Sequence, residues 1–235
     1  MTDIHNHLLF GIDDGSKTIE ESISILRDME KCGYKNIILT PHFIPDSKYN
    51  NPRSDNLQRM AMLQKELDNN NINIKLYLGN EIFIDTEIIE NINRGLISPL
   101  NNTHYLLIEL PMTGIYEDYK DIFRDLIDNG YKVILAHPER YVSFQNDFNK
   151  VYELEKMGVY FQSNLDSIIG GYGENAEKTI KRLLKEKKIA FLATDIHHKK
   201  HDYTKWERAK KMALKYLNEK EFDIITNYNP SQLLD

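Results

Sequence analysis

The chain has 235 residues, of which 41% are hydrophobic and 28% are charged. This length and composition are typical of a soluble globular protein and suit one α/β barrel domain over residues 1–235. The net charge of −6 argues against nucleic-acid binding through a broad basic surface, because phosphate backbones favour clustered Lys and Arg. A single cysteine, Cys32, excludes an intramolecular disulfide framework.

Apolar stretches are all shorter than the roughly 18 residues that a membrane-spanning helix needs, so the sequence predicts no such helix. The first residues also lack the basic and apolar segments of a secretory signal peptide. We therefore expect a cytoplasmic protein. The oligomeric state stays open.

Apolar runs and helical patterns alternate along the chain. Runs typical of buried strands cover residues 2–7, 36–40, 74–79, 105–110, 132–136, 159–162 and 189–193. Amphipathic helical patterns cover residues 18–31, 54–69, 119–129, 147–156, 174–185 and 203–218. About seven strand–helix units in succession favour a parallel sheet or a closed barrel.

The first predicted helix has sequence signals at both ends. Thr18 followed by Glu21 predicts a capping box, in which each side chain accepts a hydrogen bond from the other residue's backbone amide. Gly33 is predicted to end the helix in the left-handed conformation.

Side chains that commonly bind metals stand at the C-terminal ends of most predicted strands. They are, in chain order, His5, His7, His42, Glu81, Glu109, His137, Asp195 and His197. In a parallel barrel these strand ends converge on one face, where active sites are built. The first two and the last two are pairs of residues two positions apart, so on an extended segment the members of each pair point to the same side.

A mixture of imidazole and carboxylate suits zinc, manganese or ferrous iron, and without thiolates a purely structural zinc site is disfavoured. Each residue alone would be weak evidence, since a single histidine is commonly a hydrogen-bonded structural residue and Glu109 could face solvent. Agreement among the strand ends favours a metal site, in which the carboxylates of Glu81, Glu109 and Asp195 could bridge ions.

The segment Gly11-Ile12-Asp13-Asp14-Gly15 follows the first strand. Asp and Gly are favoured in turns, so a turn is the structural interpretation of this segment. A turn can also deliver a carboxylate to the site. We predict Asp14 as an additional metal ligand in preference to Asp13.

Arg140 follows a predicted ligand in His137-Pro138-Glu139-Arg140, and its planar fork of donors suits phosphate oxygens. An ion pair with Glu139 or another acid is an equally acceptable interpretation. Arg53, in a segment beyond His42, is a weaker candidate for the same task.

These motifs resemble, in order and type, the polymerase-and-histidinol-phosphatase superfamily, and within it the bacterial manganese-dependent protein tyrosine phosphatases of capsule and exopolysaccharide loci. The segments that carry the resemblance span nearly the whole chain. They are residues 3–7, 11–15, 40–42, 81, 108–109, 136–141 and 195–197, including Ala-His-Pro-Glu-Arg-Tyr at 136–141.

The resemblance implies an α/β fold with a distorted (β/α)7 barrel, similar to a TIM barrel, and up to three divalent ions, with manganese expected and iron or zinc as alternatives. By the same resemblance, one ion would be held by His5, His7, Glu81 and Asp195; a second by Glu81, Glu109 and His137; and the third by Asp14, His42 and His197. Arg140 would grip the phosphate as the catalytic cation.

One departure from the family pattern concerns a second Arg, which family members carry shortly after the Asp-x-His pair. Here the corresponding stretch reads His198-Lys199-Lys200-His201-Asp202. Lys199 or Lys200 could replace that Arg as a point charge, but a two-pronged grip would be lost. The departure bears on substrate affinity rather than on the metal site.

The activity that the resemblance implies is hydrolysis of phosphotyrosine, through attack by a hydroxide that the ions generate. The implied partner is a phosphotyrosine protein, the tyrosine-rich tail of a membrane-associated tyrosine kinase that governs polysaccharide export. A phosphatase of a small metabolite such as histidinol phosphate would use the same ligands. A metal-dependent amidohydrolase and a non-catalytic interaction module are more distant alternatives.

Cys32 is predicted not to be a nucleophile, because it stands at the end of a predicted helix with no Arg closely following. Three tyrosines, Tyr49, Tyr116 and Tyr172, are candidates for lining a peptide groove, although most tyrosines in such a chain simply pack.

Overall fold

The computed structural model describes residues 1–113, 119–198 and 205–234. Its strands pair in parallel and form two sheets, with the order β1-β2-β4 in one and β3-β5-β6-β7-β8-β9 in the other. The strands are β1 (Thr2–Asp3), β2 (Asn36–Leu39), β3 (His42–Phe43), β4 (Lys75–Leu78), β5 (Glu81–Phe83), β6 (Tyr105–Glu109), β7 (Lys132–Ala136), β8 (Tyr160–Asn164) and β9 (Phe191–Ala193).

Two pairs of these strands are halves of one broken strand. β2 continues into β3 across Pro41, which has no N–H to donate to the ladder, and β4 continues into β5 across Gly79. Hydrogen bonds cross both breaks, from Gly79 N to Leu39 O (2.8 Å) and from Glu81 N to Pro41 O (3.2 Å). The described strands therefore occupy seven positions around a barrel.

The first and last positions of the barrel meet just beyond β1 and β9. Asn6 forms an isolated parallel bridge with Ile196, supported by hydrogen bonds from Asp195 N to His5 O (2.8 Å) and from His7 N to Ile196 O (2.9 Å). The predicted distorted (β/α)7 barrel is confirmed, and the distortion lies in the broken strands and in this single bridge.

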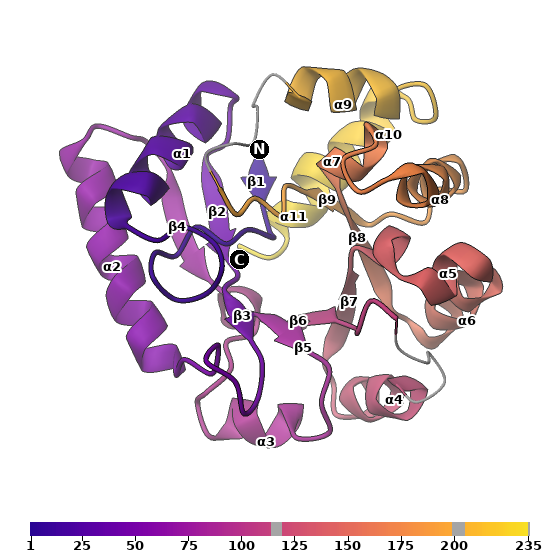
Figure 1. Ribbon diagram of the computed structural model, residues 1–235, viewed down its shortest axis with the longest axis horizontal. Coiled ribbons are helices and arrows are strands. Elements are labelled where there is room, and N and C mark those ends of the chain that lie inside the picture. The colour runs from indigo at the N-terminus through magenta and orange to yellow at the C-terminus, as the bar shows by residue number, and fades with distance from the viewer. Residues whose placement is uncertain (114–118, 199–204, 235) are drawn as a thin grey trace.

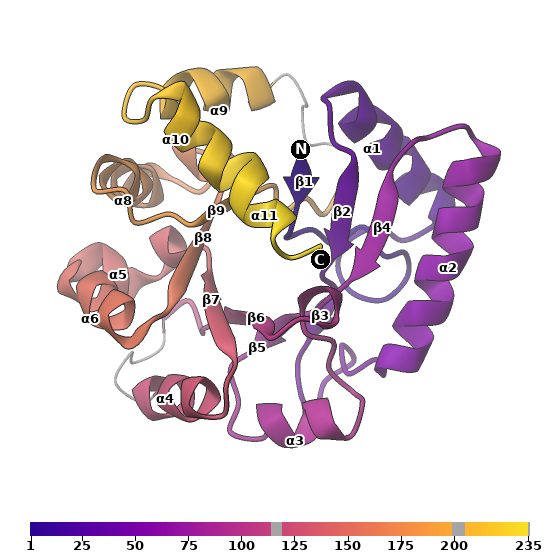
Figure 2. The same ribbon diagram turned by 180° about the vertical axis from the view of Figure 1, so that it is seen from behind.

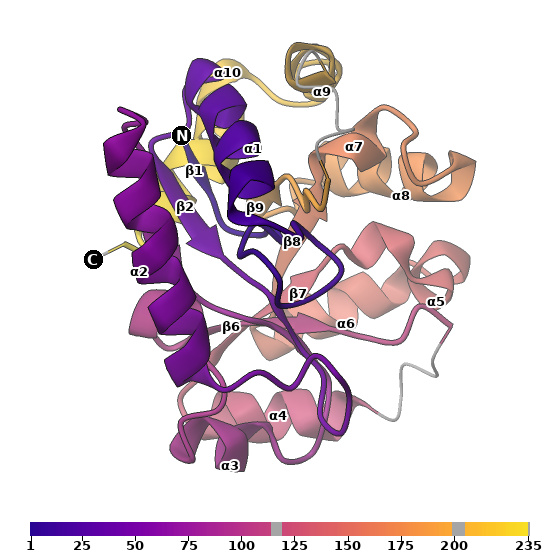
Figure 3. The same ribbon diagram turned by 60° about the vertical axis from the view of Figure 1, so that its left-hand side comes forward.

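Helices surround the ring of strands (Figure 1), and α1 and α2 lie side by side on one flank (Figure 3). The helices are α1 (Ile19–Lys31), α2 (Arg53–Asn69), α3 (Ile88–Asn93), α4 (Lys120–Asp128), α5 (Val142–Asn146), α6 (Asn149–Met157), α7 (Leu165–Ile168), α8 (Glu174–Lys185), α9 (Lys205–Ala213), α10 (Glu219–Asp223) and α11 (Asn229–Ser231). Within the described ranges, no helix is both long and apolar enough to cross a membrane.

Short helices account for most differences from the sequence prediction. α3, α5, α7, α10 and α11 each have six residues or fewer, too few for a helical period to show in the sequence. The pattern predicted to run to residue 218 ends at Ala213, and its first two residues lie outside the described ranges.

The ends of α1 agree with prediction in two respects and differ in one. Thr18 Oγ1 accepts from Glu21 N (3.3 Å), and Gly33 follows the helix with a φ of 93°. The Glu21 carboxylate, however, accepts from Lys17 N (2.9 Å), one residue before the expected partner. The reciprocal half of the predicted capping box was therefore wrong.

The barrel interior is apolar at one end and polar at the other. Ile4, Ile38, Leu107 and Ile134 pack together inside, and Leu233 from the C-terminal segment joins them. That segment crosses the back of the barrel (Figure 2). Because this segment closes the apolar end of the barrel, the site forms at the opposite end, where the strands have their C-terminal ends.

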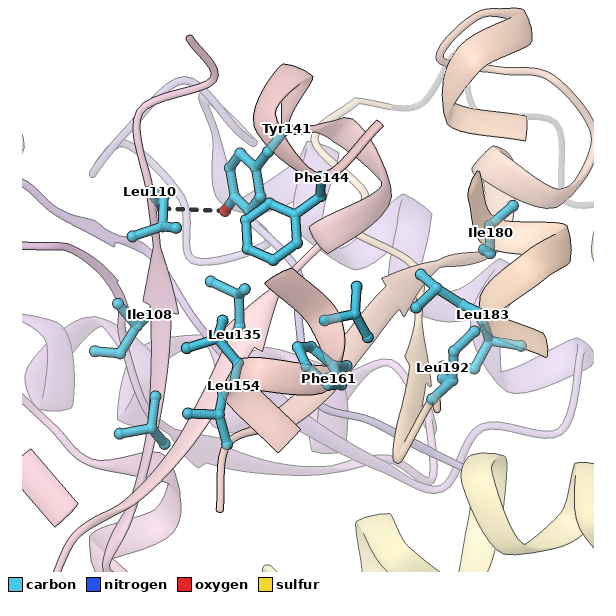
Figure 4. Close-up of a cluster of buried hydrophobic side chains, with 14 of the residues drawn as sticks. Ile108, Leu110, Leu135, Tyr141, Phe144, Leu154, Phe161, Ile180, Leu183 and Leu192 are labelled. Atoms are coloured by element: carbon cyan, nitrogen blue, oxygen red, sulfur yellow. Dashed lines mark hydrogen bonds between the residues drawn. The ribbon is translucent and has the colours of Figure 1, made fainter. Parts of the chain in front are cut away.

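A second core fills the space between the later strands and their helices (Figure 4). Phe144 of α5 and Phe161 of β8 are nearly inaccessible to solvent there. Tyr141 is equally buried, and its hydroxyl accepts a hydrogen bond from Leu110 N (3.0 Å). The bond ties the turn after β7 to the end of β6, and both segments carry predicted site residues.

Candidate metal centre

All nine predicted metal ligands lie together at the C-terminal ends of the strands. They fall into four overlapping groups, in each of which the potential ligand atoms lie within 4.8 Å of one another. The groups are His5, His7 and Glu81; His5, His137 and Asp195; His42, Glu81 and Glu109; and His7, Asp14, His42 and His197.

Glu81, at the start of β5, is the centre of the cluster. Its Oε1 lies 3.3 Å from His5 Nε2 and 2.9 Å from His137 Nε2, and its Oε2 lies 3.2 Å from His7 Nε2 and 3.0 Å from His42 Nδ1. One carboxylate thus faces four imidazoles from three strand positions, since His5 and His7 both follow β1, His42 begins β3 and His137 follows β7. This arrangement allows Glu81 to bridge two ions.

The two carboxylate oxygens of Asp195 have different partners, one inside the cluster and one outside it. Its Oδ1 faces inward, 3.4 Å from His5 Nε2 and 3.5 Å from His7 Nε2. Its Oδ2 accepts hydrogen bonds from Asn164 Nδ2 (2.6 Å), Arg140 Nη1 (3.1 Å) and the Tyr172 hydroxyl (3.3 Å). The three donors hold the carboxylate so that Oδ1 stays directed at the histidines.

The remaining predicted ligands line the outer part of the cluster. Glu109 lies 3.6 Å from His137 and 3.9 Å from His42, which contradicts the interpretation that it faces solvent from its strand. Asp14 Oδ1 lies 3.5 Å from both His42 Nε2 and His197 Nε2. The Asp14 side chain is 52% exposed, so this side of the cluster is the one open to solvent.

Asp13 and Asp14 have different positions in the turn after β1. The buried Asp13 carboxylate lies 2.7 Å from His7 Nδ1 and accepts from Gly15 N (2.9 Å) and His42 N (3.0 Å). It therefore orients His7 from behind, while Asp14 faces two imidazole nitrogens. Histidine ligands commonly have such a carboxylate on the nitrogen that does not bind metal.

The fixed charges of the cluster perturb its titrating groups strongly. Burial alone would lower the pKa of His5, but the Glu81 and Asp195 carboxylates outweigh burial and raise that pKa to about 9. Burial opposes ionisation of Glu81 and Asp195, yet His5 and its neighbouring imidazoles hold the pKa of both carboxyls well below the usual range. Burial and the charge of His7 lower the pKa of His197 to about 4.

The hydrogen bonding of the buried histidines also indicates that divalent cations could bind in this cluster. His5 Nε2, His7 Nε2 and His42 Nδ1 are buried atoms that lack a hydrogen-bond partner, although buried polar atoms in proteins are generally bonded. Each points toward the carboxylates of Glu81 or Asp195 at 3.0–3.5 Å. A cation between them would satisfy nitrogens and carboxylates together, and this nitrogen–oxygen donor set suits manganese, iron and zinc.

Comparison with known proteins agrees with this geometry. The family described as capsular polysaccharide synthesis, CpsB/CapC, matches residues 1–235. The chain belongs to this family.

Relatives of known name support the assignment. CapC of Staphylococcus aureus is 33% identical over 201 residues, which cover 84% of this chain and 77% of CapC. The tyrosine-protein phosphatase YwqE of Bacillus subtilis is 31% identical over 200 residues, which cover 85% of this chain and 78% of YwqE.

A structure from work on YwqE of Bacillus subtilis and CpsB of Streptococcus pneumoniae, described as metal-dependent tyrosine phosphatases, superposes with a TM-score of 0.92 at 29% identity. It covers 100% of this chain and 94% of that one. Histidinol phosphate phosphatase of Lactococcus lactis shares the fold, with a TM-score of 0.62 at 16% identity, covering 92% of this chain and 93% of that one.

The backbone of this family member is strained at two of the predicted ligands. His137 has a φ of 33° and Asp195 a φ of 51°, both in the left-handed region that non-glycine residues rarely adopt. Such residues cost about 1–3 kcal/mol each and cluster at functional sites, where the surrounding structure holds them. Here the strain turns both side chains toward the centre of the barrel face.

The predicted phosphate-binding cations have different surroundings. Arg140 pairs with Asp195 rather than with Glu139, and its guanidinium stacks 4.4 Å from the centre of the Tyr172 ring. Arg53 donates to Asn102 Oδ1 (2.5 Å). Lys199 and Lys200 lie outside the described residues.

The three candidate groove tyrosines also differ. Tyr49 is half-buried, with its ring 5.8 Å from the His42 ring, and Tyr172 is half-buried beside Arg140 and Asp195. Tyr116 lies outside the described residues. The two that are described both contact the cluster.

Sequence reasoning missed the residues that hold the ligands. Gln162 and Asn164 of β8 contact His5 and Asp195, and Tyr172 contacts Asp195 and Arg140. Amides and phenols are not typical metal ligands, so a search for ligand chemistry passed over them. The available signal was the polar run Gln162-Ser163-Asn164 at the end of an apolar strand.

Cys32 caps α1 and packs against an apolar cluster that includes Met29 and Leu67. Partial burial and nearby carboxylates such as Asp28 raise the pKa of its thiol, the opposite of what an activated nucleophile requires. We expect Cys32→Ser to keep kcat/KM for a phosphotyrosyl peptide within about twofold of wild type, because Cys32 lies at the end of α1 and belongs to none of the groups of potential ligands among the described residues. A folded variant without activity would contradict this expectation.

Proposed function

We propose that this chain is a metal-dependent protein tyrosine phosphatase. The observation that carries the proposal is the convergence of nine imidazole and carboxylate side chains on one barrel face, with Arg140 in contact with one of them. Membership of the CpsB/CapC family and the likeness to YwqE and CpsB support it.

The proposed ions are held in three sets, with manganese as the expected metal and iron or zinc as alternatives. One ion is assigned to His5, His7, Glu81 and Asp195; a second to Glu81, Glu109 and His137; and the third to Asp14, His42 and His197. When bound, these cations supply a water of lowered pKa and positive charge near the phosphoryl oxygens.

The protein's own groups position the substrate. Hydrolysis breaks the bond between phosphorus and the phenolic oxygen and yields tyrosine and inorganic phosphate. Negative charge on the phosphoryl oxygens is met by the Arg140 guanidinium, whose fork suits phosphate. Asp195 and Tyr172 hold that guanidinium beside the cluster, so little of its freedom has to be lost on binding.

The proposed substrate is a phosphotyrosine protein, specifically the tyrosine-rich tail of a membrane-associated kinase that controls capsule or exopolysaccharide synthesis. The family's description, capsular polysaccharide synthesis, supports a partner of this kind. A cytoplasmic location is proposed, because it would bring the enzyme to a substrate of that kind. Residues 1–235 are proposed to act as one domain.

A comparison of two substrates tests the proposed activity. We expect kcat/KM for a phosphotyrosyl peptide to exceed that for histidinol phosphate about tenfold or more, a ratio within the reach of pocket contacts. Both would be measured with added Mn²⁺ on the same preparation, with released phosphate as the readout. A preference for histidinol phosphate would contradict the proposed substrate class and favour the metabolite phosphatase.

A further inference from the structure

We propose that the side-chain amides of Gln162 and Asn164 form a hydrogen-bond relay that fixes the tautomer of His5 and so raises the affinity of the centre for metal. The inference rests on the proposed metal centre and deepens it. Neither amide is itself a ligand; both are positioning residues.

The relay runs along the end of β8 and joins two predicted ligands. Gln162 and Asn164 are two positions apart on the strand, so their side chains lie on the same side. Gln162 Oε1 lies 2.8 Å from His5 Nδ1, Gln162 Nε2 donates to Asn164 Oδ1 (2.9 Å), and Asn164 Nδ2 donates to Asp195 Oδ2 (2.6 Å). All four side chains are almost completely buried.

The chemistry of Asp195 fixes the direction of every bond in this relay. An ionised carboxylate only accepts, so Asn164 has to present its NH₂ group to Asp195 and its oxygen to Gln162. Gln162 in turn presents its NH₂ group to Asn164 and its oxygen to His5. His5 Nδ1 therefore carries a proton, and in the neutral imidazole the lone pair is on Nε2.

The nitrogen left with the lone pair is the one that faces the cluster. His5 Nε2 lies 3.3 Å from Glu81 Oε1 and 3.4 Å from Asp195 Oδ1. Without the relay, a proton on Nε2 would be favoured, because it could be donated to either carboxylate. Of the two neutral tautomers, that one would block the ligand position, so the relay favours the neutral tautomer that can bind an ion.

A buried carboxylate keeps the end of β8 in place. Glu139 Oε1 accepts from Asn164 N (2.9 Å) and from Ser167 Oγ (2.7 Å) at the start of α7. Both bonds restrain the backbone that carries Asn164. The amides are therefore held in position before any ion binds.

Calorimetric titration of metal-free protein with Mn²⁺ tests the relay without measuring turnover. We expect Gln162→Met to weaken Mn²⁺ binding about 10- to 100-fold, the usual effect of removing an outer partner of a ligand. Gln64→Met is the matched control: Gln64 also bonds through both ends, to Ile74 O (3.1 Å) and from Leu76 N (2.9 Å), and ties α2 to β4. It should lower stability and leave Mn²⁺ affinity unchanged.

The double variant separates a relay from two independent structural roles. If the amides act as one chain, Gln162→Met with Asn164→Leu should weaken Mn²⁺ binding little more than the stronger single variant. The relay would be overturned if the two losses of Mn²⁺ affinity multiplied in the double variant, or if the single variants bound Mn²⁺ like wild type. Wild-type protein that binds no Mn²⁺ would instead overturn the proposed metal centre.

A measurement on the unaltered protein covers the case in which the variants do not fold. In the Zn²⁺-loaded protein, nitrogen chemical shifts of the His5 ring should show a proton on Nδ1 and metal on Nε2. Metal on Nδ1, or a proton on Nε2, would overturn the relay.

Discussion

Glu81→Gln should reduce kcat/KM for a phosphotyrosyl peptide about 1000-fold or more. The carboxylate faces four imidazoles at 2.9–3.3 Å and is assigned to two of the three ions. Metal ions contribute several kcal/mol to transition-state stabilisation, and loss of about 4 kcal/mol corresponds to roughly 1000-fold. The amide keeps the shape of the side chain but loses its charge, so metal content should fall together with activity.

Two further variants make the Glu81 result interpretable. Glu90→Gln removes an exposed carboxylate from α3 and should leave activity and metal content unchanged. Asp14→Asn alters a half-exposed predicted ligand, so it should fold normally and still lose activity. Thermal unfolding of all three would be recorded alongside metal content. A folded Glu81→Gln protein with wild-type activity would refute the role assigned to this carboxylate.

Arg140→Lys should lower kcat/KM about 100- to 1000-fold, the usual cost of removing a preorganised donor that meets developing charge. Lysine keeps the positive charge but loses the planar fork, and its ammonium cannot reproduce the stack against Tyr172. Because the ligands remain, Mn²⁺ content should stay at the wild-type level. This combination distinguishes phosphate binding from damage to the metal centre.

Arg124→Lys is the matched control for this substitution. Arg124 is an exposed residue of α4 that pairs with Asp121, and its replacement should change neither activity nor metal content. If Arg140→Lys lost metal along with activity, its main role would be the ion pair with Asp195. If Arg140→Lys kept full activity, the proposed role of Arg140 in binding the phosphate would be wrong.

Much of the fold could be predicted because its signals are local and repeated. Each buried strand is a compact apolar run, such as residues 132–136, and each long helix has a period that shows over several turns. Short helices such as α3 and α5 lack that period. The short strands β3 and β5, which continue beyond Pro41 and Gly79, were not predicted, because two or three residues are too few to show a strand pattern.

The candidate ligands could be placed together from topology, because parallel strands bring their C-terminal ends to one face. The groups behind them could not. The contact of Asp13 with His7 depends on how one turn folds back on its strand, and Gly15 permits this because any Cβ there would lie 1.9 Å from His7 O. The bond from Asn164 to Asp195 joins residues 31 positions apart through side-chain geometry alone.

Anomalous diffraction from crystals grown with Mn²⁺ tests directly whether these side chains surround divalent ions. We expect anomalous peaks among His5, His7, Glu81 and Asp195, beside Glu109 and His137, and between Asp14, His42 and His197. A map without peaks at these positions, from protein that hydrolyses phosphotyrosine at full rate after chelation, would contradict the proposed metal centre.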